Sequence, residues 1–336
     1  MLRTGARNLI TDVAGLRVGN AQDAALRSGV TVVLADRLVP AVVDVRGGAP
    51  GTRDTEALGQ AAIEGGADAI VLSGDSVFGL DAPAGVTALL REQGRGFQFS
   101  PTGPRMPLVP GAILFDLANG GDKAWEGETP YRALGRRAAQ GAGLDFPLGN
   151  VGAGLGATAG AYKGGLGSAS TLTEDGLTVG AIVAVNALGS PLIPGTDVFW
   201  AWPFEQEGEY GGRRLKPDHI GGDLDLPADM KGYVRAATNT TIAIVAVDAD
   251  ASRSELARIA VMAADGFARA LRPVHTPFDG DIVFAMATGA RPLAEPRLRA
   301  IMRLGSLAAD TLARAIARGV YEARSLGSMK SYRDSF

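Results

Sequence analysis

The sequence predicts a mixed α/β fold in which helices cover sheets that are buried on both faces. Near-continuous apolar runs of strand length recur along the chain, and such runs are typical of strands covered on both sides. Segments with helical periodicity stand between and after these runs. A four-layer αββα sandwich and a doubly wound α/β sheet both satisfy this pattern.

The predicted strands are rich in valine, isoleucine and alanine, and most are bounded by turn residues. They cover residues 30–34, 41–45, 69–72, 181–185, 242–247 and 282–286. Glycine is abundant, with 47 residues spread along the chain in short turns, which indicates tight connections rather than a disordered tail.

Two helices are predicted in the last third of the chain. Ser252-Arg-Ser-Glu255 reads as a capping box that opens the first of them. Its apolar positions keep helical spacing at Leu256, Ile259, Ala260, Ala263 and Phe267. The second covers about residues 297–318 and carries one apolar stripe.

Composition excludes several classes of protein. The 336 residues include 46% hydrophobic residues, and the net charge of −3 comes from interspersed acids and bases, so neither nucleic acid nor a membrane is an expected partner. The first eight residues, Met-Leu-Arg-Thr-Gly-Ala-Arg-Asn, lack an apolar targeting segment, and no run reaches the length of a membrane span, so a cytoplasmic location is expected. The absence of cysteine excludes disulfides and thiolate chemistry.

No cofactor is expected. In the glycine-rich loop 150–165, Gly154, Gly156 and Ala159 fit the spacing of a dinucleotide fingerprint, but no apolar strand precedes them. The glycines are better explained as letting the backbone pack close to a pocket. A metal site is not expected either, because His275, Asp279 and Asp281 lack a zinc-like spacing and the other histidine, His219, lies in a polar segment.

That polar, turn-rich segment spans residues 202–230 and stands just before Asn239-Thr240-Thr241. Asn-Thr before a strand is commonly a simple loop. It can also be a bond that cuts itself, because cleavage before Thr240 would free an α-amine with a pKa near 7.7 to 8.0 as the base for its own hydroxyl. The polar segment is then either a region that lets the new ends separate or an ordinary surface excursion.

Seven motifs, in order over nearly the full length of the chain, carry a resemblance to a known family. They are 15–20, 28–34, 43–52, 72–80, 109–116, 239–241 and 278–281, including Val43-Asp-Val-Arg-Gly-Gly-Ala-Pro-Gly-Thr52 and Val109-Pro-Gly-Ala-Ile-Leu-Phe-Asp116. With these motifs the chain resembles the DmpA-like self-processing amidases, which include L-aminopeptidase/D-esterases, β-aminopeptidases and nylon-oligomer hydrolases. The resemblance implies a single αββα domain over residues 1–336, cleaved into 1–239 and 240–336, and usually assembled as a homotetramer.

The resemblance also implies the site residues. Thr240 would be the nucleophile, supported by Lys163, Asn186, Asp279 and Asp281. The lysine and the asparagine would stabilise the oxyanion, and the two carboxylates would orient the Thr240 amine and the substrate amine. Without the resemblance, the lysine reads as a surface residue, the asparagine as the start of a turn, and Asp-Gly-Asp as a solvated turn.

One position departs from the nylon hydrolases. Phe78 stands where they carry a tyrosine hydroxyl, so it is assigned to substrate binding without that hydroxyl. We therefore expect an aminopeptidase that cleaves amides or short peptides with a free amino end. A 6-aminohexanoate-oligomer hydrolase, acyl transfer to an amine, and an uncleaved non-enzymatic binding protein on the same fold remain as alternatives.

Overall fold

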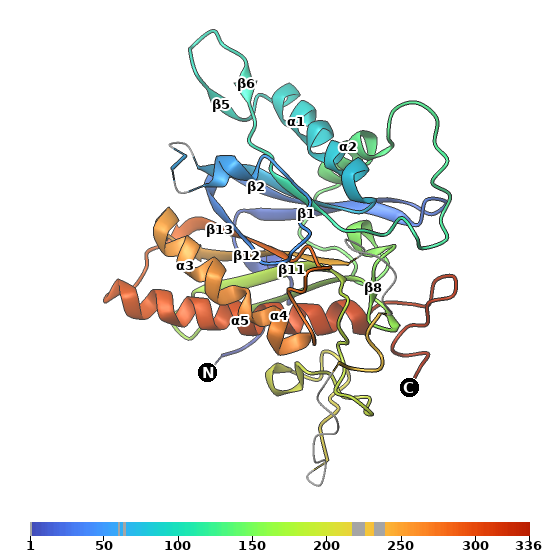
Figure 1. Cartoon of the computed structure of the whole chain (residues 1–336). Helices are drawn as coiled ribbons and strands as arrows, with labels where there is room; N and C mark the ends of the chain where they lie inside the picture. The colour runs from blue at the N-terminus through green and yellow to red at the C-terminus, as the bar shows by residue number, and fades with distance from the viewer. Residues whose placement is uncertain (1, 60, 63–64, 217–225, 232–238) are drawn as a thin grey trace.

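The computed structural model describes residues 2–59, 61–62, 65–216, 226–231 and 239–336. Its main strands form one hydrogen-bonded path that folds over into two stacked layers, with helices on both outer faces (Figure 1). This is the four-layer αββα sandwich. The doubly wound alternative is wrong, because most neighbouring strands in both layers run antiparallel.

The two layers are called sheet A and sheet B here. Sheet A contains β10 (Leu166–Leu172), β11 (Thr178–Asn186), β12 (Thr240–Ala249), β13 (Ile282–Arg291) and the end of β2. Sheet B contains β1 (Leu16–Asp23), β4 (Gly66–Ser73), β7 (Gly111–Ile113) and β3 (Thr52–Arg53), together with the first part of β2. The whole of β2 spans Ser28–Val45. Two small hairpins pair β5 (Phe97–Gln98) with β6 (Arg105–Met106) and β8 (Thr158–Ala159) with β9 (Tyr162–Lys163).

Each sheet has its own helices. Sheet B is covered by α1 (Ala82–Glu92) and α2 (Tyr131–Gln140), and sheet A by α3 (Arg253–Ala263), α4 (Asp265–Ala270) and α5 (Arg297–Tyr321). Short 3-10 turns are η1 (Ile10–Asp12), η2 (Thr55–Leu58), η3 (Ser76–Asp81), η4 (Gly152–Gly154) and η5 (Trp202–Phe204). Within the described residues, no helix is both long and apolar enough to cross a membrane.

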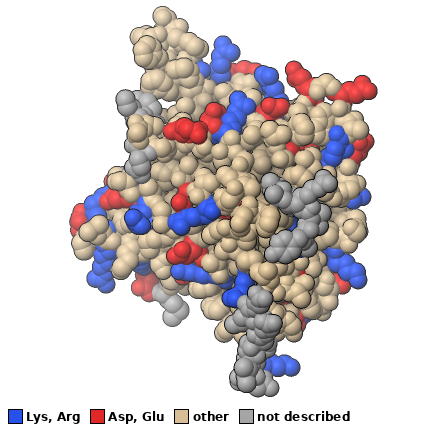
Figure 2. Space-filling model, viewed as in Figure 1, with Lys and Arg blue, Asp and Glu red and all other residues tan. Residues whose placement is uncertain are grey.

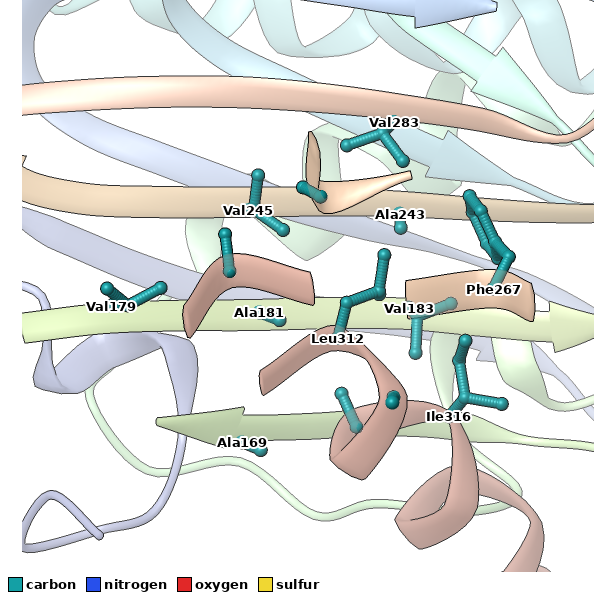
Figure 3. Close-up of a cluster of buried hydrophobic side chains, with 14 of the residues drawn as sticks. Ala169, Val179, Ala181, Val183, Ala243, Val245, Phe267, Val283, Leu312 and Ile316 are labelled. Atoms are coloured by element: carbon teal, nitrogen blue, oxygen red, sulfur yellow. The ribbon is translucent and has the colours of Figure 1, made fainter. Parts of the chain in front are cut away.

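Strand β12 shows why its sequence reads as one apolar run. Ile242, Ile244 and Ala246 belong to the core between the two sheets. The alternate residues Ala243, Val245 and Val247 point to the other face of sheet A, toward the helices α3, α4 and α5 that cover it. Figure 3 shows two of these, Ala243 and Val245, in one cluster with Leu312 and Ile316 of α5. Successive side chains of a strand point to opposite faces, so burial on both faces requires an apolar residue at every position.

The predicted strands 30–34 and 41–45 are two parts of one strand, β2. Its first part pairs with β1 and β4 in sheet B, and its second part, Ala41–Val45, pairs with β13 in sheet A. The register against β4 shifts between Leu34 and Val39, where the strand passes from one sheet to the other. Exposed Asp36 and Arg37 interrupt the apolar run at this bend, which is why it reads as two strands.

The capping box at Ser252 and Glu255 is confirmed. The predicted helix after it is divided at Ala264 into α3 and α4, although its five apolar positions are all buried. Figure 2 shows basic and acidic side chains interspersed over the face it presents, as the composition indicates.

Candidate active site

Three strand ends meet at one edge of sheet A and carry the predicted residues. Thr240 is the first residue of β12 and is only 3% exposed. It pairs with Asn186, the last residue of the antiparallel strand β11. On its other side, Asn239 forms a parallel bridge to Asp279, just before β13 begins. Residues from three distant parts of the sequence therefore converge around the Asn239–Thr240 bond.

The hydroxyl of Thr240 lies against the carbonyl that it would attack. Thr240 Oγ1 is 2.5 Å from the carbonyl oxygen of Asn239 and donates a hydrogen bond to it. The same oxygen accepts a second hydrogen bond, 3.0 Å long, from the backbone N–H of Gly280. A backbone donor fixed on a carbonyl oxygen stabilises the negative charge that develops there when the carbonyl carbon is attacked.

Gly280 has to be a glycine for this arrangement. A Cβ at this position would lie 2.7 Å from Thr240 Oγ1 and 2.7 Å from the backbone oxygen of Ala49. The middle residue of Asp-Gly-Asp is thus a close backbone approach, and the solvated-turn interpretation of this motif is wrong, since both carboxylates are buried.

Asp281 fixes the start of β12. Its Oδ1 accepts the backbone N–H of Thr241 at 2.8 Å, and its Oδ2 lies 3.0 Å from both the backbone nitrogen and Nδ1 of His275. The carboxylate therefore holds the backbone at Thr241, next to Thr240. No group of three or more histidine, cysteine, aspartate or glutamate residues in the described part of the chain could hold a metal ion. His219 lies outside the described residues.

Asp279 is a buried carboxylate without a full set of strong donors. Its Oδ2 accepts hydrogen bonds from Thr276 Oγ1 at 2.6 Å and Thr276 N at 3.2 Å, and its Oδ1 accepts a longer one, 3.3 Å, from Leu188 N. Burial, followed by repulsion from Asp281, raises the pKa of Asp279 above its usual range. A cation bound beside Oδ1 would relieve this cost.

The side chain of Asn186 is held from both ends. Its Nδ2 donates to the carbonyl oxygen of Phe115 at 2.9 Å, and its Oδ1 accepts the Thr158 N–H at 3.0 Å. The donor from Thr158 fixes which end of the amide carries oxygen. One Nδ2 hydrogen is thus already used in the intact chain.

Lys163 is buried, so its interpretation as a surface lysine is wrong. Its ammonium donates to three backbone carbonyls of its own loop, those of Gly154, Ala157 and Gly164, at 3.1, 2.7 and 2.8 Å. Burial lowers the pKa of Lys163 to about 7, against the opposing attraction of Asp116. In the intact chain the lysine shapes the loop behind Asn186.

The glycine loop packs as expected. A Cβ at Gly164 would lie 2.0 Å from the backbone oxygen of Val185 in β11. This close approach brings Lys163 to the strand end that carries Asn186, and it needs no nucleotide to explain the glycines.

A second lysine, Lys231, was missed by the sequence analysis. Its Nζ lies 3.1 Å from Asn186 Oδ1, and its backbone N–H donates to the carbonyl of Leu188 at 2.9 Å. Burial lowers the pKa of Lys231 to about 7, opposed by the attraction of Asp279. The sequence signal was only its position, one residue beyond the polar segment 202–230 and close to the Asn239–Thr240 bond.

Phe78 lies in η3 and is 40% exposed. Its ring packs edge-on against Trp125, with ring centroids 5.2 Å apart, and Trp125 in turn contacts Tyr131 of α2. These contacts belong to the sheet B side of the molecule, and the assignment of Phe78 to substrate binding stays a prediction.

The chain is similar to known proteins over nearly its full length. The family model described as "Peptidase family S58" matches residues 8–333. A protein of Mycobacterium tuberculosis (strain ATCC 25618 / H37Rv) that is named an uncharacterized aminopeptidase is 42% identical over 346 residues, which cover 98% of each chain. A 6-aminohexanoate-oligomer endohydrolase of Kocuria sp. (strain KY2) is 29% identical over 298 residues, covering 85% of this chain and 76% of the relative.

Solved structures show the same fold. A Burkholderia sp. beta-aminopeptidase superposes with a TM-score of 0.72 at 23% identity, covering 98% of this chain and 91% of the other. The L-aminopeptidase D-Ala-esterase/amidase of Ochrobactrum anthropi gives 0.66 at 21% identity, covering 97% and 89%. The latter is described as a variant of the Ntn hydrolase fold.

Proposed function

This chain belongs to peptidase family S58, and from that membership we propose that it is an aminopeptidase which matures by cutting its own Asn239–Thr240 bond. Hydrolysis of peptide or amide bonds is the activity that the family and the named relatives support. The single observation that carries the self-cleavage is the contact of Thr240 Oγ1 with the Asn239 carbonyl, which also accepts the Gly280 N–H.

The proposed maturation has two steps. Thr240 Oγ1 attacks the Asn239 carbonyl carbon, the C–N bond breaks, and an ester joins Asn239 to the threonine oxygen while the nitrogen becomes an α-amine. Water then opens the ester and leaves a new carboxylate at Asn239. In turnover the free α-amine of Thr240 takes the proton from Oγ1, the hydroxyl attacks the substrate amide, and water releases the acyl group.

The products are fragments 1–239 and 240–336, which we expect to stay together as one folded domain. Two strand pairings cross the cut, because β12 pairs with β11 and β13 pairs with β2. The buried pair of Arg314 and Glu209 also joins the two fragments.

The test is the intact mass of the purified protein under denaturing conditions. The wild-type chain should give the two fragments, the second beginning at Thr240. Thr240→Ala should stay whole, and Thr240→Ser should still be cleaved because it keeps the hydroxyl. Fragments from Thr240→Ala, or a new end at Thr241, would refute the assignment of the nucleophile.

The proposed substrates are amino-acid amides and short peptides with a free amino end. Support comes from the buried carboxylate of Asp279, whose raised pKa marks a site that gains from a nearby cation. The aminopeptidase relatives at 42% identity rank this activity above hydrolysis of 6-aminohexanoate oligomers, the activity named for relatives at 29%.

Substrate choice is tested with three compounds: an amino-acid p-nitroanilide, its N-acetyl analogue and a linear 6-aminohexanoate oligomer. The free anilide should be cut and the capped one should not. Equal rates on both would reject recognition of the ammonium, and activity on the oligomer alone would make the second activity the right one. An uncleaved chain that cuts none of them would favour the non-enzymatic alternative.

We further propose a cytoplasmic enzyme that needs no cofactor and assembles as a homotetramer of cleaved pairs. Closed symmetry is the usual form of such assemblies. Light scattering checks the assembly, and the mass of a single chain would contradict it.

A further inference from the structure

Lys231 holds a place in the site that the proposed mechanism does not use. Its backbone N–H donates to the carbonyl of Leu188, and the N–H of Leu188 donates to Asp279 Oδ1. Leu188 thus connects the backbone of the lysine to the carboxylate, through its carbonyl on one side and its N–H on the other. The lysine is delivered to this point by the chain on the N-terminal side of the Asn239–Thr240 bond.

The ammonium of Lys231 donates a hydrogen bond to an acceptor that would suit a primary amine. Nζ is 3.1 Å from Asn186 Oδ1, and Asn186 is the residue opposite Thr240 in the sheet. Asp279 attracts this ammonium, whereas Lys163 repels it. Lys163 itself cannot serve the same acceptors, because its three N–H groups already donate to the carbonyls of its own loop.

A lysine side chain presents a primary ammonium at the end of a methylene chain. The proposed substrates present the same group close to the amide that is cut. We propose that in the uncleaved chain Lys231 occupies the subsite for the substrate ammonium, next to Asn186 and close to the Leu188–Asp279 hydrogen bond, and keeps it filled until the Asn239–Thr240 bond is cut. This inference rests on the proposed function, since it takes the recognised group to be the free amine of the substrate.

Three consequences follow from this occupancy. The uncleaved chain binds amines poorly, because a tethered group is present at an effective concentration that a free ligand must overcome. Removal of the lysine side chain opens the subsite without any cleavage. A bound amine pushes the Lys231 ammonium away from Asn186.

The first experiment measures binding to chains that cannot cleave. All variants carry Thr240→Ala, and the probe is 6-aminohexanamide, with its N-acetyl derivative as the capped control. When the lysine fills the subsite in about nine molecules of ten, Lys231→Met should tighten the Kd of the probe by about tenfold, because apparent affinity scales with the open fraction. Lys231→Arg keeps the cation and should bind as weakly as the parent. Lys216→Met, which changes an exposed lysine of the polar segment 202–230, should also leave the Kd unchanged.

The second experiment needs no change at Lys231. The chain has five lysines, so their Nζ resonances can be followed by NMR after labelling with 15N-lysine in the Thr240→Ala protein. Addition of the probe should move the Lys231 resonance toward the value of the exposed lysines, and the capped probe should not.

The outcomes separate the inference from the function on which it rests. Equal affinity of the parent and Lys231→Met for the free amine, or an unmoved Lys231 resonance while the probe binds, would overturn the inference and leave the proposed substrate class standing. No difference between the free and the capped probe in any variant, including the cleaved wild type, would overturn both.

Discussion

The two sides of the Asn239–Thr240 bond are held in very different ways. On the C-terminal side, β12 is an inner strand of sheet A, all ten of its residues are buried, and Asp281 binds the N–H of Thr241. On the N-terminal side, Asn239 is held by the Gly280 N–H and by its bridge to Asp279. Lys231, the last described residue before it, donates a backbone hydrogen bond to Leu188 and contacts Asn186 with its side chain. The position of Thr240 is therefore set by sheet A as well as by the bond that we propose it breaks.

The largest effect is expected where the two sides are tied together. Arg314 of α5 is 1% exposed and pairs at 2.5 Å with Glu209 from the polar segment, whose side chain is 6% exposed. Arg314→Met leaves the buried carboxylate of Glu209 with only one, more distant cation, Arg318 at 3.6 Å, among the described ion pairs. The loss of the closer pair should lower the free energy of unfolding by up to about 3–5 kcal/mol. Thermal or denaturant unfolding of the uncleaved Thr240→Ala chain measures this.

The matched control is Arg303→Met on the same helix. Arg303 pairs with Asp175 at 3.0 Å, with both side chains nearly half exposed. Its loss should cost about 0–1 kcal/mol. Similar losses in the two variants would show that the buried pair is not what holds the two sides together.

The next effect concerns the donor that faces the scissile carbonyl. Gly280→Ala places a Cβ 2.7 Å from Thr240 Oγ1 and displaces both the hydroxyl and the N–H donor. Self-cleavage should slow by about 10³-fold, at the upper end for loss of one oxyanion donor. A time course of intact mass measures the rate.

Gly141→Ala is the control, because the nearest atom to a Cβ at Gly141 is 3.6 Å away. That variant should cleave at the wild-type rate. Normal cleavage in Gly280→Ala would mean that the Gly280 N–H has no part in the reaction.

A smaller effect is expected for Asn186 and Lys163, which both lie in the N-terminal fragment. Their substitution should lower turnover of the cleaved enzyme less than Gly280→Ala slows self-cleavage. Asn186→Ala and Lys163→Ala should both fold and should lower kcat by about 10²-fold, with a smaller change in KM, since both are assigned to charge in the transition state. Lys330→Ala, an exposed side chain beside the same loop, should retain wild-type turnover. A residue whose variant keeps the wild-type kcat has a structural role only.

The smallest effect is the change of stability per unit of pH, at most about 1.4 kcal/mol for one proton. Burial raises the pKa of Asp116 to about 7 despite the attraction of Lys123. The folded chain then binds more protons than the unfolded chain between about pH 4 and 7, so this group contributes stability at low pH that is lost as the pH rises toward 7. Asp116→Asn should flatten that part of the stability profile of the Thr240→Ala chain, and the exposed substitution Asp145→Asn should not. An unchanged slope in Asp116→Asn would contradict the assignment.

Much of the fold could be predicted, because strands buried on both faces are apolar at nearly every position. The runs 242–247 and 282–286 are apolar at every position, and both are central strands. The helices α1 and α2 were not predicted. The continuity of β2 was also missed, because its bend carries exposed polar residues. The two parts are joined into one strand by pairing with strands distant in sequence, β4 on both sides of the bend and β13 after it.

The site was predictable to the extent that local motifs carry it. Asn239-Thr240 and Asp279-Gly-Asp281 are each short and lie at strand starts, and the structure brings them together. The partners of Lys163 and Lys231 were not predictable, because the sequence around each lysine does not show whether its side chain is buried. Lys163 was found by resemblance alone, and Lys231 had no motif to mark it.

The position of β2 makes the proposed cleavage depend on the folding of distant parts of the chain. Asp281 stands where it does because its carbonyl binds the N–H groups of Arg46 and Gly47, which follow β2, and because β13 pairs with the end of β2. Residues near the beginning and near the end of the chain must therefore meet before the N–H of Gly280 faces the Asn239 carbonyl, and contacts so far apart in sequence form late and slowly. Self-cleavage at Thr240 would then occur only after the chain has folded completely. Only fully folded chains would acquire the amine that makes them enzymes.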